Sequence, residues 1–529
     1  MRKRKDRNQE RGMALLIALL ALLLVSAIGM GMMYMSSTET SINANYRDTQ
    51  QAFFAMRAGL EEGRDRMRKN AVSPLTLPTV VPNSATAGSI LYITNPAASE
   101  TVDPVTYSST NKYFDDEFCH EGFTGVTYTG VVTGVPCTGS AQAPPSAAYT
   151  TTASVAAYTG TTAALNYKWV RITMKQNATI GATAKVNPLQ PDSSQVCWDS
   201  SNGKEIAVTA LGYSTCALAQ NAGFLVAPVY ILTSLSYTPQ GSRRMGQYEV
   251  AAVNITPPPG ALSMDGPGAT FTPVASSSNF FMNGNNNTTY TGPGTCSTTT
   301  PAVAPGVSTG SSAGVTSIDA SIQGPPDRTT SYSGTNGTTT TPSVVDQGTD
   351  AGGTGALSGL WASPLQLNNL VASIANGADQ TLSGCGISGT TTASASACGY
   401  PAGGLGTDAN PLITYVNGDF NMGDHSGAGL LVVTGTLSIG GNAGFDGLVM
   451  VIGQGIFSES GGGNGQFNGS LFVANTNGHT SPFTQLGTLG SPQFGWNGGG
   501  NNGIQFNSCW ANLENDLHFM VVSSREEMY

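Results

Sequence analysis

The sequence predicts a fold that combines α+β and all-β parts, with one long N-terminal helix and a strand-rich remainder. A run of 23 uncharged residues, 13–35, follows a basic N-terminus and predicts the helix. Alternation of apolar and polar residues from position 167 indicates an antiparallel sheet. A glycine-rich motif that recurs after 22 residues in the C-terminal third predicts a parallel β-solenoid.

The first 12 residues form a basic leader that ends at Gly12. The leader contains six Lys or Arg residues and two acidic residues, and the apolar run starts at Met13. A helix needs about 20 apolar residues to span a bilayer, and a basic flank stays in the cytoplasm. We therefore expect a single-pass membrane helix whose C-terminal side is exported.

The polarity break at Gly12 lies before the apolar run rather than after it. A cleaved secretory signal has an apolar core of about 7–15 residues followed by an A-x-A-like site; here the run is longer and no clear site follows it. The arrangement resembles a type III signal, in which prepilin peptidase removes the leader and the apolar helix is kept. An ordinary uncleaved signal anchor is the alternative.

Residues 36–69 continue the helix with an amphipathic pattern. Apolar side chains recur at helical spacing, among them Ile42, Tyr46, Phe53 and Leu60, and no proline precedes Pro74. We expect one helix over residues 13–73, roughly 55 residues at ~1.5 Å per residue. Its first half would lie in the membrane, and its second half would pack under a globular head.

Three segments carry a family resemblance. They are RGMALLIALLALLLVSAIGMG, E-x-x-I-x-x-N-Y-R-x-x-Q-x-A-F from Glu39 to Phe53, and A-G-L-E from Ala58 to Glu61. Together they resemble the N-terminal region of PilX-type minor pilins of bacterial type IV pili. The resemblance implies cleavage after Gly12, methylation of the Met13 amine and packing against other pilins through the helix. The helix positions concerned are Ile17, Glu39, Ile42, Tyr46, Phe53 and Leu60.

The chain departs from this family pattern at two places. Major pilins carry Glu at the fifth mature position, where this chain has Ile17. Loss of that Glu is familiar in PilX-like proteins and in the GspK-type tip subunit of type II secretion systems, so it favours a minor, tip or initiating subunit. Where the family often has Ala-Glu before the A-G-L-E motif, this chain has Met56-Arg57.

The charge of the chain argues against nucleic acid as a partner. The 529 residues carry a formal net charge of −10, and only 10% of them are charged. The leader contributes +4, so the chain without it would carry −14. Phosphate binding needs clustered Lys and Arg, which this composition does not supply.

Eight cysteines in an exported chain favour disulfides. Pairing of neighbours would join Cys119 to Cys137, Cys197 to Cys216, and Cys385 to Cys398, leaving Cys296 with Cys509. Other pairings are open, as are free buried thiols. Because the sequence contains no CxxC motif, the cysteines give little indication of a zinc site or of a thioredoxin-like redox motif.

Three regions follow the helix. Residues 74–258 form an expected disulfide-tied β head, with strands at 167–175, 224–237 and 244–255. Residues 259–354 are rich in Thr, Ser, Gly, Asn and Pro, and we interpret them as a low-complexity linker. Residues 355–529 contain an amphipathic helix, interrupted by Pro364, and the repeat.

The repeat reads GGNAGFDGLVMVI at 440–452 and GGNGQFNGSLFVA at 462–474. Apolar residues would stack inward, glycines would take tight corners, and the two asparagines would form a turn ladder. The amphipathic helix would cap the open end of the solenoid, and a Gly-rich sandwich is the alternative fold. The repeat positions are Gly441, Asn442, Phe445, Gly447, Gly463, Asn464, Phe467 and Gly469.

The sequence contains few residue patterns that indicate catalysis. Asp424-His425, near Asp419 and Asp446, suggests a metal site or a carboxylate pair, but Asp and Asn are also ordinary turn residues, which is the simpler interpretation. The chain has no Walker A, GxSxG or HExxH motif. We therefore predict a protein that is not an enzyme, with no catalytic residues, cofactor or metal.

The resemblance implies a minor type IV pilin that helps pilus assembly or initiation and supports adhesion or aggregation near the tip. It would start in the bacterial inner membrane, with its C-terminus outside, and move to the pilus and cell surface. Its partners would be other pilins, prepilin peptidase and a glycan or cell-surface ligand. The alternatives are a GspK-like pseudopilin and a membrane-anchored β-solenoid enzyme or adhesin that acts on polysaccharide.

Overall fold

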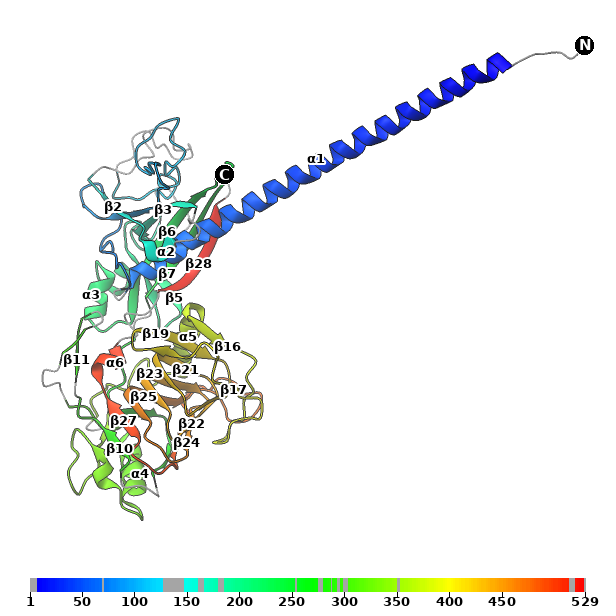
Figure 1. The fold of residues 1–529 in the computed structure, drawn as a ribbon. Helices are drawn as coiled ribbons and strands as arrows, with labels where there is room; N and C mark the ends of the chain where they lie inside the picture. Colours follow the sequence, from blue (N-terminus) through cyan, green and yellow to red (C-terminus); the bar gives the residue numbers. More distant parts are fainter. Residues whose placement is uncertain are drawn as a thin grey trace, which may run out of the picture.

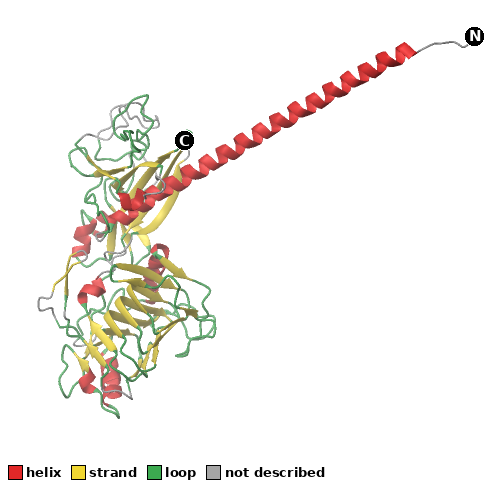
Figure 2. Cartoon of the chain, viewed as in Figure 1, coloured by secondary structure: helices red, strands yellow, loops and turns green. Residues whose placement is uncertain are grey.

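One long apolar helix followed by a mostly β region makes up the computed structural model (Figures 1 and 2). Helix α1, Arg7–Met67, projects from the rest of the molecule, and it ends sooner than the predicted boundary at residue 73. The chain turns back beyond Met67, where the Arg66 guanidinium donates to the Ser73 carbonyl oxygen at 2.9 Å. The structure describes residues 7–68, 71–126, 147–159, 166–178, 185–252, 255–274, 279–286, 288–292, 295–297, 303–349, 353–512 and 519–527.

The head is a mainly antiparallel sheet laid against the second half of α1. Its strand order is β2-β1-β3-β6-β7-β28, and the short strands β4 and β5 extend it beside β6. The pairs β3–β6 and β6–β7 lie where the sequence predicted three successive strands. The strands are β1 Ile90–Thr94, β2 Tyr149–Ala153, β3 Tyr167–Met174, β4 Val196–Asp199, β5 Lys204–Ala207, β6 Val226–Tyr237, β7 Arg243–Ala251 and β28 Met520–Glu527.

Strand β3 is buried along its whole length, whereas its alternating pattern suggested that one face meets solvent. Val170 and Ile172 pack with side chains of α1, including Leu60. Trp169, on the other face, packs with Phe118 from the segment between β1 and β2. The polar face is therefore covered by a long connection, which local alternation does not reveal.

The last strand of the chain belongs to the head. Strand β28 pairs antiparallel with β7, from Met520 opposite Ala251 to Glu527 opposite Met245. The predicted boundary, which placed residues 355–529 in the C-terminal region, needs correction for this strand. The polypeptide between β7 and β28 is thus an insertion between two adjacent strands of the head sheet.

The inserted region contains two parallel sheets, and the chain passes alternately through them. Strands β19, β21, β23, β25 and β27 are neighbours in one sheet, and β20, β22, β24 and β26 are neighbours in the other. Between the sheets lies a core of aromatic and aliphatic side chains, in which the rings of Phe457 and Phe494 stack 5.0 Å apart. The bounds are β19 Asn410–Val416, β20 Phe420–Gly423, β21 Ser426–Val433, β22 Thr436–Gly440, β23 Gly444–Gly453, β24 Ile456–Ser460, β25 Gln466–Asn475, β26 Gln493–Trp496 and β27 Gly503–Phe506.

Residues 259–354 are not a linker, which corrects the prediction. Strand β8 (Leu262–Asp265) pairs with β25, and β9 (Thr270–Thr272) pairs with β26. The sparse apolar residues of this region, such as Met264 and Phe271, are buried in the core between the sheets. Each strand has only two to four residues, so the composition of the region as a whole is still that of a linker. The other elements here are β10 Phe281–Asn283, β11 Thr289–Gly292, β12 Thr295–Ser297, β13 Val307–Thr309, α4 Ser312–Gln323, β14 Tyr332–Ser333 and β15 Val344–Asp346.

Helix α5, Pro364–Gly377, joins the two regions. Pro364 lies in its first turn, where a proline is tolerated, so it begins the helix rather than interrupting it. Leu370 packs in one cluster with Met450 of β23 and Val229 of the head. The helix therefore covers a face of the parallel sheet and does not cap its end. The short elements not yet named are α2 Ala156–Thr159, α3 Cys216–Asn221, β16 Gln380–Leu382, β17 Cys398–Gly399, β18 Gly406–Thr407 and α6 Ser508–Asn512.

Candidate functional site

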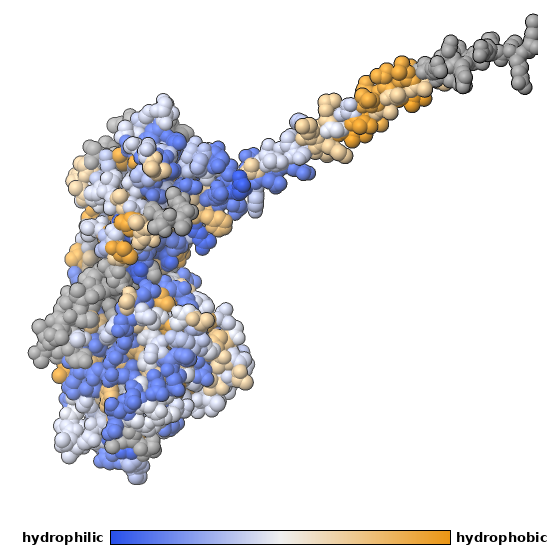
Figure 3. All heavy atoms as spheres, in the orientation of Figure 1, coloured by the Kyte–Doolittle hydropathy of each residue, from blue (hydrophilic) through white to orange (hydrophobic). Residues whose placement is uncertain are grey.

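The first half of α1 is an apolar surface that no other part of the described chain covers. Its side chains are exposed on all sides, Ile17 to 64% and Leu23 to 69%. Among the described residues, this is the helix that is long and apolar enough to cross a membrane (Figure 3). Such a surface in water is strongly unfavourable, at about 25 cal/mol per Å². This half of α1 therefore suits an apolar environment, and it is long enough to cross a membrane once.

The predicted apolar stripe on the second half of α1 is only partly covered by the head. Leu60 is 1% exposed beneath the head sheet, and Phe53 is partly buried at its edge. Ile42 and Tyr46 remain more than 60% exposed, and Glu39 is exposed as well. The head therefore covers only the C-terminal part of the stripe, and Ile42 and Tyr46 are accessible to another chain.

Two glycines set the distance between α1 and the head. A Cβ atom at Gly59 would lie 2.5 Å from the Ser234 hydroxyl oxygen and 2.9 Å from the Tyr167 ring. At Gly63 it would lie 3.1 Å from a methyl group of Val170. Packing therefore explains the Gly in the A-G-L-E motif, because a larger residue would push the helix away from β3 and β6.

Met56 and Arg57, which depart from the PilX pattern, lie in different surroundings: Met56 is buried and Arg57 is exposed. Met56 is 4% exposed and lies over Gly246, where an added Cβ would come within 2.5 Å of the Met56 sulfur. Arg57 is exposed and lines a shallow groove between α1 and the end of β28, with Phe53 and Arg525. The changed charge therefore lies on the surface and leaves the packing intact.

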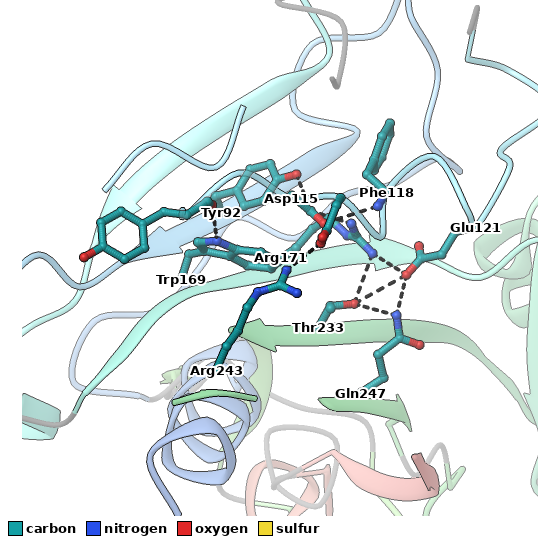
Figure 4. Close-up of polar contacts among 11 residues, drawn as sticks. Tyr92, Asp115, Phe118, Glu121, Trp169, Arg171, Thr233, Arg243 and Gln247 are labelled. Carbon is teal, nitrogen blue, oxygen red and sulfur yellow. Dashed lines mark hydrogen bonds and ion pairs between the residues drawn. The ribbon is translucent and has the colours of Figure 1, made fainter. Parts of the chain in front are cut away.

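A buried charge cluster centres on Arg171 of β3 (Figure 4). The Arg171 side chain is fully buried and forms ion pairs with Asp115 and Glu121. Tyr92 donates its hydroxyl to Asp115 at 2.8 Å, and Gln247 donates its amide to Glu121. Burial raises the pKa of the Glu121 carboxyl, and Arg171 opposes that rise. The cluster attaches the segment after β1 to the sheet, and it is closed to solvent.

Two predicted disulfides are present. Cys197 and Cys216 are bonded beside β4, and Cys385 and Cys398 are bonded in the connection before β19. Cys119 and Cys509 are also disulfide-bonded. Their predicted partners cannot be placed, since Cys137 lies outside the described residues and the Cys296 side chain is not described.

The repeat residues lie on adjacent strands in register. Phe445 is opposite Phe467, and Gly447 is opposite Gly469. A Cβ atom at Gly469 would lie 1.8 Å from the Gly447 carbonyl oxygen, so the strands pass too closely for a side chain. At the corner, the side-chain oxygen of Asn442 accepts from the Asn464 backbone N–H at 3.2 Å.

The corner glycines of the repeat are equally confined. A Cβ atom at Gly463 would lie 2.3 Å from the Gly441 carbonyl oxygen, and one at Gly441 would lie 2.6 Å from a backbone carbon of Gly462. The corner formed by Gly441 and Gly463 therefore has room for backbone only. The spacing of 22 residues corresponds to one passage through both sheets.

The candidate carboxylates of the sequence have separate partners. Asp424 accepts a hydrogen bond from the Asn442 backbone N–H at 3.1 Å. The Asn442 side chain in turn accepts one from the Asn464 backbone N–H. Asp419 is buried and accepts backbone N–H groups of Ser388, Ser394 and Thr436. Each of these two carboxylates therefore stabilises a connection between strands through backbone hydrogen bonds. Among the described residues, no group of three or more His, Cys, Asp or Glu side chains is placed to hold a metal ion.

Asp446 differs from these two carboxylates because it lines an open cleft. The cleft has a volume of about 660 Å³ and is lined also by Tyr400, Asp408, Asn410 and Ser426. Burial raises the pKa of Asp446 to about 6; the Asn468 amide opposes the rise, and the nearby Asp408 carboxyl adds to it. No sequence pattern indicated Asp408 or Tyr400, since neither belongs to the repeat.

No family model, curated protein or solved structure matches this chain. The assignment of its function therefore depends on the geometry of the chain itself. Three features are available for it: the exposed apolar half of α1, the head packed on the other half, and the cleft in the inserted region.

Proposed function

We propose that this chain is a minor pilin of the PilX type, which uses α1 to enter a filament and displays the inserted region outside. The observation that carries the proposal is the division of α1. Its first half is apolar and exposed on all sides, and its second half packs into a β head. A helix of this kind suits a membrane before assembly and the helical core of a filament afterwards.

The position of the inserted region supports a place at or near the tip. It lies beyond the head, at the end of the molecule opposite the N-terminus of α1 (Figure 1). Residues 252–519, between β7 and β28, add a bulky body that would collide with neighbours in a closely packed shaft. Ile17 agrees with this placement, because it cannot offer a carboxylate to the amine of a neighbouring subunit.

We also propose that the inserted region is a parallel β-solenoid. Successive strands alternate between two parallel sheets, and the repeat stacks in register at intervals of one passage. Stacked coils bury a continuous core and leave polar side chains outside. An elongated body of this kind is suited to carry an adhesive surface away from the filament.

The decisive experiment is mass spectrometry of the mature N-terminus, on protein from its native host. A chain that starts at Met13 with a methylated amine is the expected result. A chain that still starts at Met1 would contradict the proposal and make residues 13–35 a plain anchor. Replacing Gly12 with Ala should block processing, and Gly31→Ala is the matched control because its Cβ would have nothing within 4 Å.

A GspK-like pseudopilin is the second candidate, and Ile17 favours it equally. Deletion of the gene separates the two. Loss of pili and of aggregation, with normal secretion of folded exoproteins, would support the minor pilin. Blocked secretion with normal piliation would support the pseudopilin. Immunogold label spread evenly along the shaft would contradict the tip position.

A further inference from the structure

The cleft that contains Asp446 is built from three separate parts of the inserted region. Asp408 and Asn410 come from the hairpin between β18 and β19, Ser426 begins β21, and Asp446 lies on β23. Its volume of about 660 Å³ falls within the range of about 300–1,000 Å³ that is typical of small-molecule sites. The cleft is far in sequence from α1 and shares no lining residue with the head.

An aromatic side chain is fixed at the side of this cleft. The Tyr400 ring stacks on the His425 ring with centroids 4.1 Å apart, and the Tyr400 hydroxyl donates to the Ser426 carbonyl oxygen at 2.6 Å. These two contacts hold the ring before any ligand arrives. A fixed aromatic surface lowers the entropy lost on binding. Such a surface suits the apolar C–H face of a sugar ring.

The charges of the cleft select the ligand. Asp408 and Asp446 lie against each other, and the described lining contains no Lys, Arg or His. Two adjacent carboxylates repel an anion and accept hydrogen bonds from hydroxyl, amide and ammonium groups. A uronic acid or a phosphate is therefore disfavoured, whereas a neutral sugar or an amino sugar fits.

A row of polar side chains continues from Asp446 across the outer face of the sheet. The Asn468 amide donates to Asp446 at 2.6 Å, the Asn283 amide donates to Gln505 at 2.9 Å, and Ser333 donates to Asn283 at 2.8 Å. Each of these residues lies opposite the next one on the neighbouring strand. The order of the strands is β23, β25, β27, β10 and β14. Neighbouring strands lie about 4.8 Å apart, so the half-buried Asn468 extends the cleft by one such step, whereas Gln505 farther along the row is buried.

We propose that this cleft binds an oligosaccharide of neutral or amino-sugar residues, with Tyr400 against a ring face and the Asp408–Asp446 pair accepting hydrogen bonds from the sugar. A chain longer than one sugar would continue over Asn468, next to Asp446. This proposal rests on the proposed function in one respect only: the cleft would be the binding site through which the protein adheres. Failure of sugar binding would leave the N-terminal processing result unaffected.

The test is calorimetric titration of the full chain, purified in detergent, with three hexasaccharides at pH 7. These are the N-acetylglucosamine hexamer, the glucosamine hexamer and hexagalacturonate. We expect saturable binding of the first two and at least tenfold weaker binding of the third. Tyr400→Ala should weaken binding of the first two at least tenfold. Tyr107→Ala, at an exposed tyrosine in the head, is the matched control and should leave binding unchanged.

Asp408→Asn tests the charge argument at an exposed position in the turn between β18 and β19. We expect it to weaken the glucosamine hexamer more than its N-acetylated counterpart and to leave the melting temperature unchanged. The proposal is overturned if no hexasaccharide binds, if hexagalacturonate binds as tightly as the others, or if Tyr400→Ala binds like the original chain. Equal affinity for hexalysine and the glucosamine hexamer would also overturn it, because the cleft would then recognise positive charge rather than sugar.

Discussion

At the scale of single residues, close contact and buried charge determine how the head is held. Gly59 and Gly63 let α1 approach β3 and β6 at a distance that no larger residue allows. On the opposite face of the sheet, Arg171 carries a full charge without solvent. Ion pairs of this kind stabilise only while both partners are present, because removing one leaves the other charged and buried.

Replacing Gly59 with Val should destabilise the head by about 1–3 kcal/mol, the usual cost of inserting methyl groups into a packed interface. The added atoms would meet the Ser234 hydroxyl and the Tyr167 ring. Urea denaturation followed by tryptophan fluorescence measures the loss. Gly31→Val is the control, since a Cβ there has open space. Equal stability of the two variants would show that α1 is not held at this contact.

Replacing Arg171 with Leu should cost about 3–5 kcal/mol, because Asp115 and Glu121 would remain buried without their cation. The loss should shrink at acidic pH, where the Glu121 carboxyl, whose pKa is raised by burial, takes up a proton. Denaturation curves at pH 7 and pH 4.5 measure both effects. Arg244→Leu removes a surface ion pair with Glu526 and should cost no more than about 1 kcal/mol. A similar loss for both arginines would contradict the role of the buried cluster.

At the scale of secondary-structure elements, the inserted region contains buried carboxyls without a cation beside them. Asp265 on β8 and Glu459 on β24 are buried, and burial raises the pKa of each to about 7. Backbone N–H groups of Gly266 and Gly498 partly oppose these shifts. Both strands thus fold most easily with their carboxyls protonated.

The inserted region should therefore be more stable at pH 5 than at pH 8. For each group the folded pKa lies above the unfolded one, so its contribution is fully present below about pH 4 and is lost as pH rises through about 7. We expect a melting temperature several degrees lower at pH 8. Asp265→Asn and Glu459→Gln together should flatten this dependence. A profile that is unchanged in the double variant would contradict the assignment.

At the scale of the whole molecule, the head and the inserted region depend on each other. The chain leaves the head after β7, forms the parallel sheets and returns as β28 beside β7. Helix α5 lies between the two regions, where Gly377 is so close to Met520 that an added Cβ would come within 2.1 Å. The head sheet is therefore complete only after the inserted region has been made.

Truncation of the chain after Asn512 should destabilise the head, although the missing residues lie at the far end of the sequence. The deletion removes β28, exposes the edge of β7 and uncovers part of the cluster around Leu370. Limited proteolysis should then cleave the head more rapidly than in the full chain. The matched control is Glu526→Gln, which loses one surface ion pair. Equal protease resistance of the truncated and full chains would contradict the interdependence.

The sequence by itself determined the features that depend on neighbours along the chain. These are the apolar run at 13–35, the helix that continues it, the strands β3, β6 and β7, and the disulfides Cys197–Cys216 and Cys385–Cys398. Their signals are local: a period of 3.6 or 2, an uncharged run, or cysteines close in sequence. The 22-residue repeat is local in the same sense, because both copies carry the Gly-Gly-Asn start, the Phe and the Gly that follows it at the same positions.

Only the tertiary structure decided which distant segments meet. Strand β28 joins β7 across more than half of the chain, β8 pairs with β25, and Arg171 finds Asp115 and Glu121 on a connection without periodic pattern. The Asp408–Asp446 pair likewise joins a hairpin tip to a sheet. Pairing between segments so far apart in sequence depends on the whole packed core. A strand of three or four residues is too short for its apolar pattern to predict its partner.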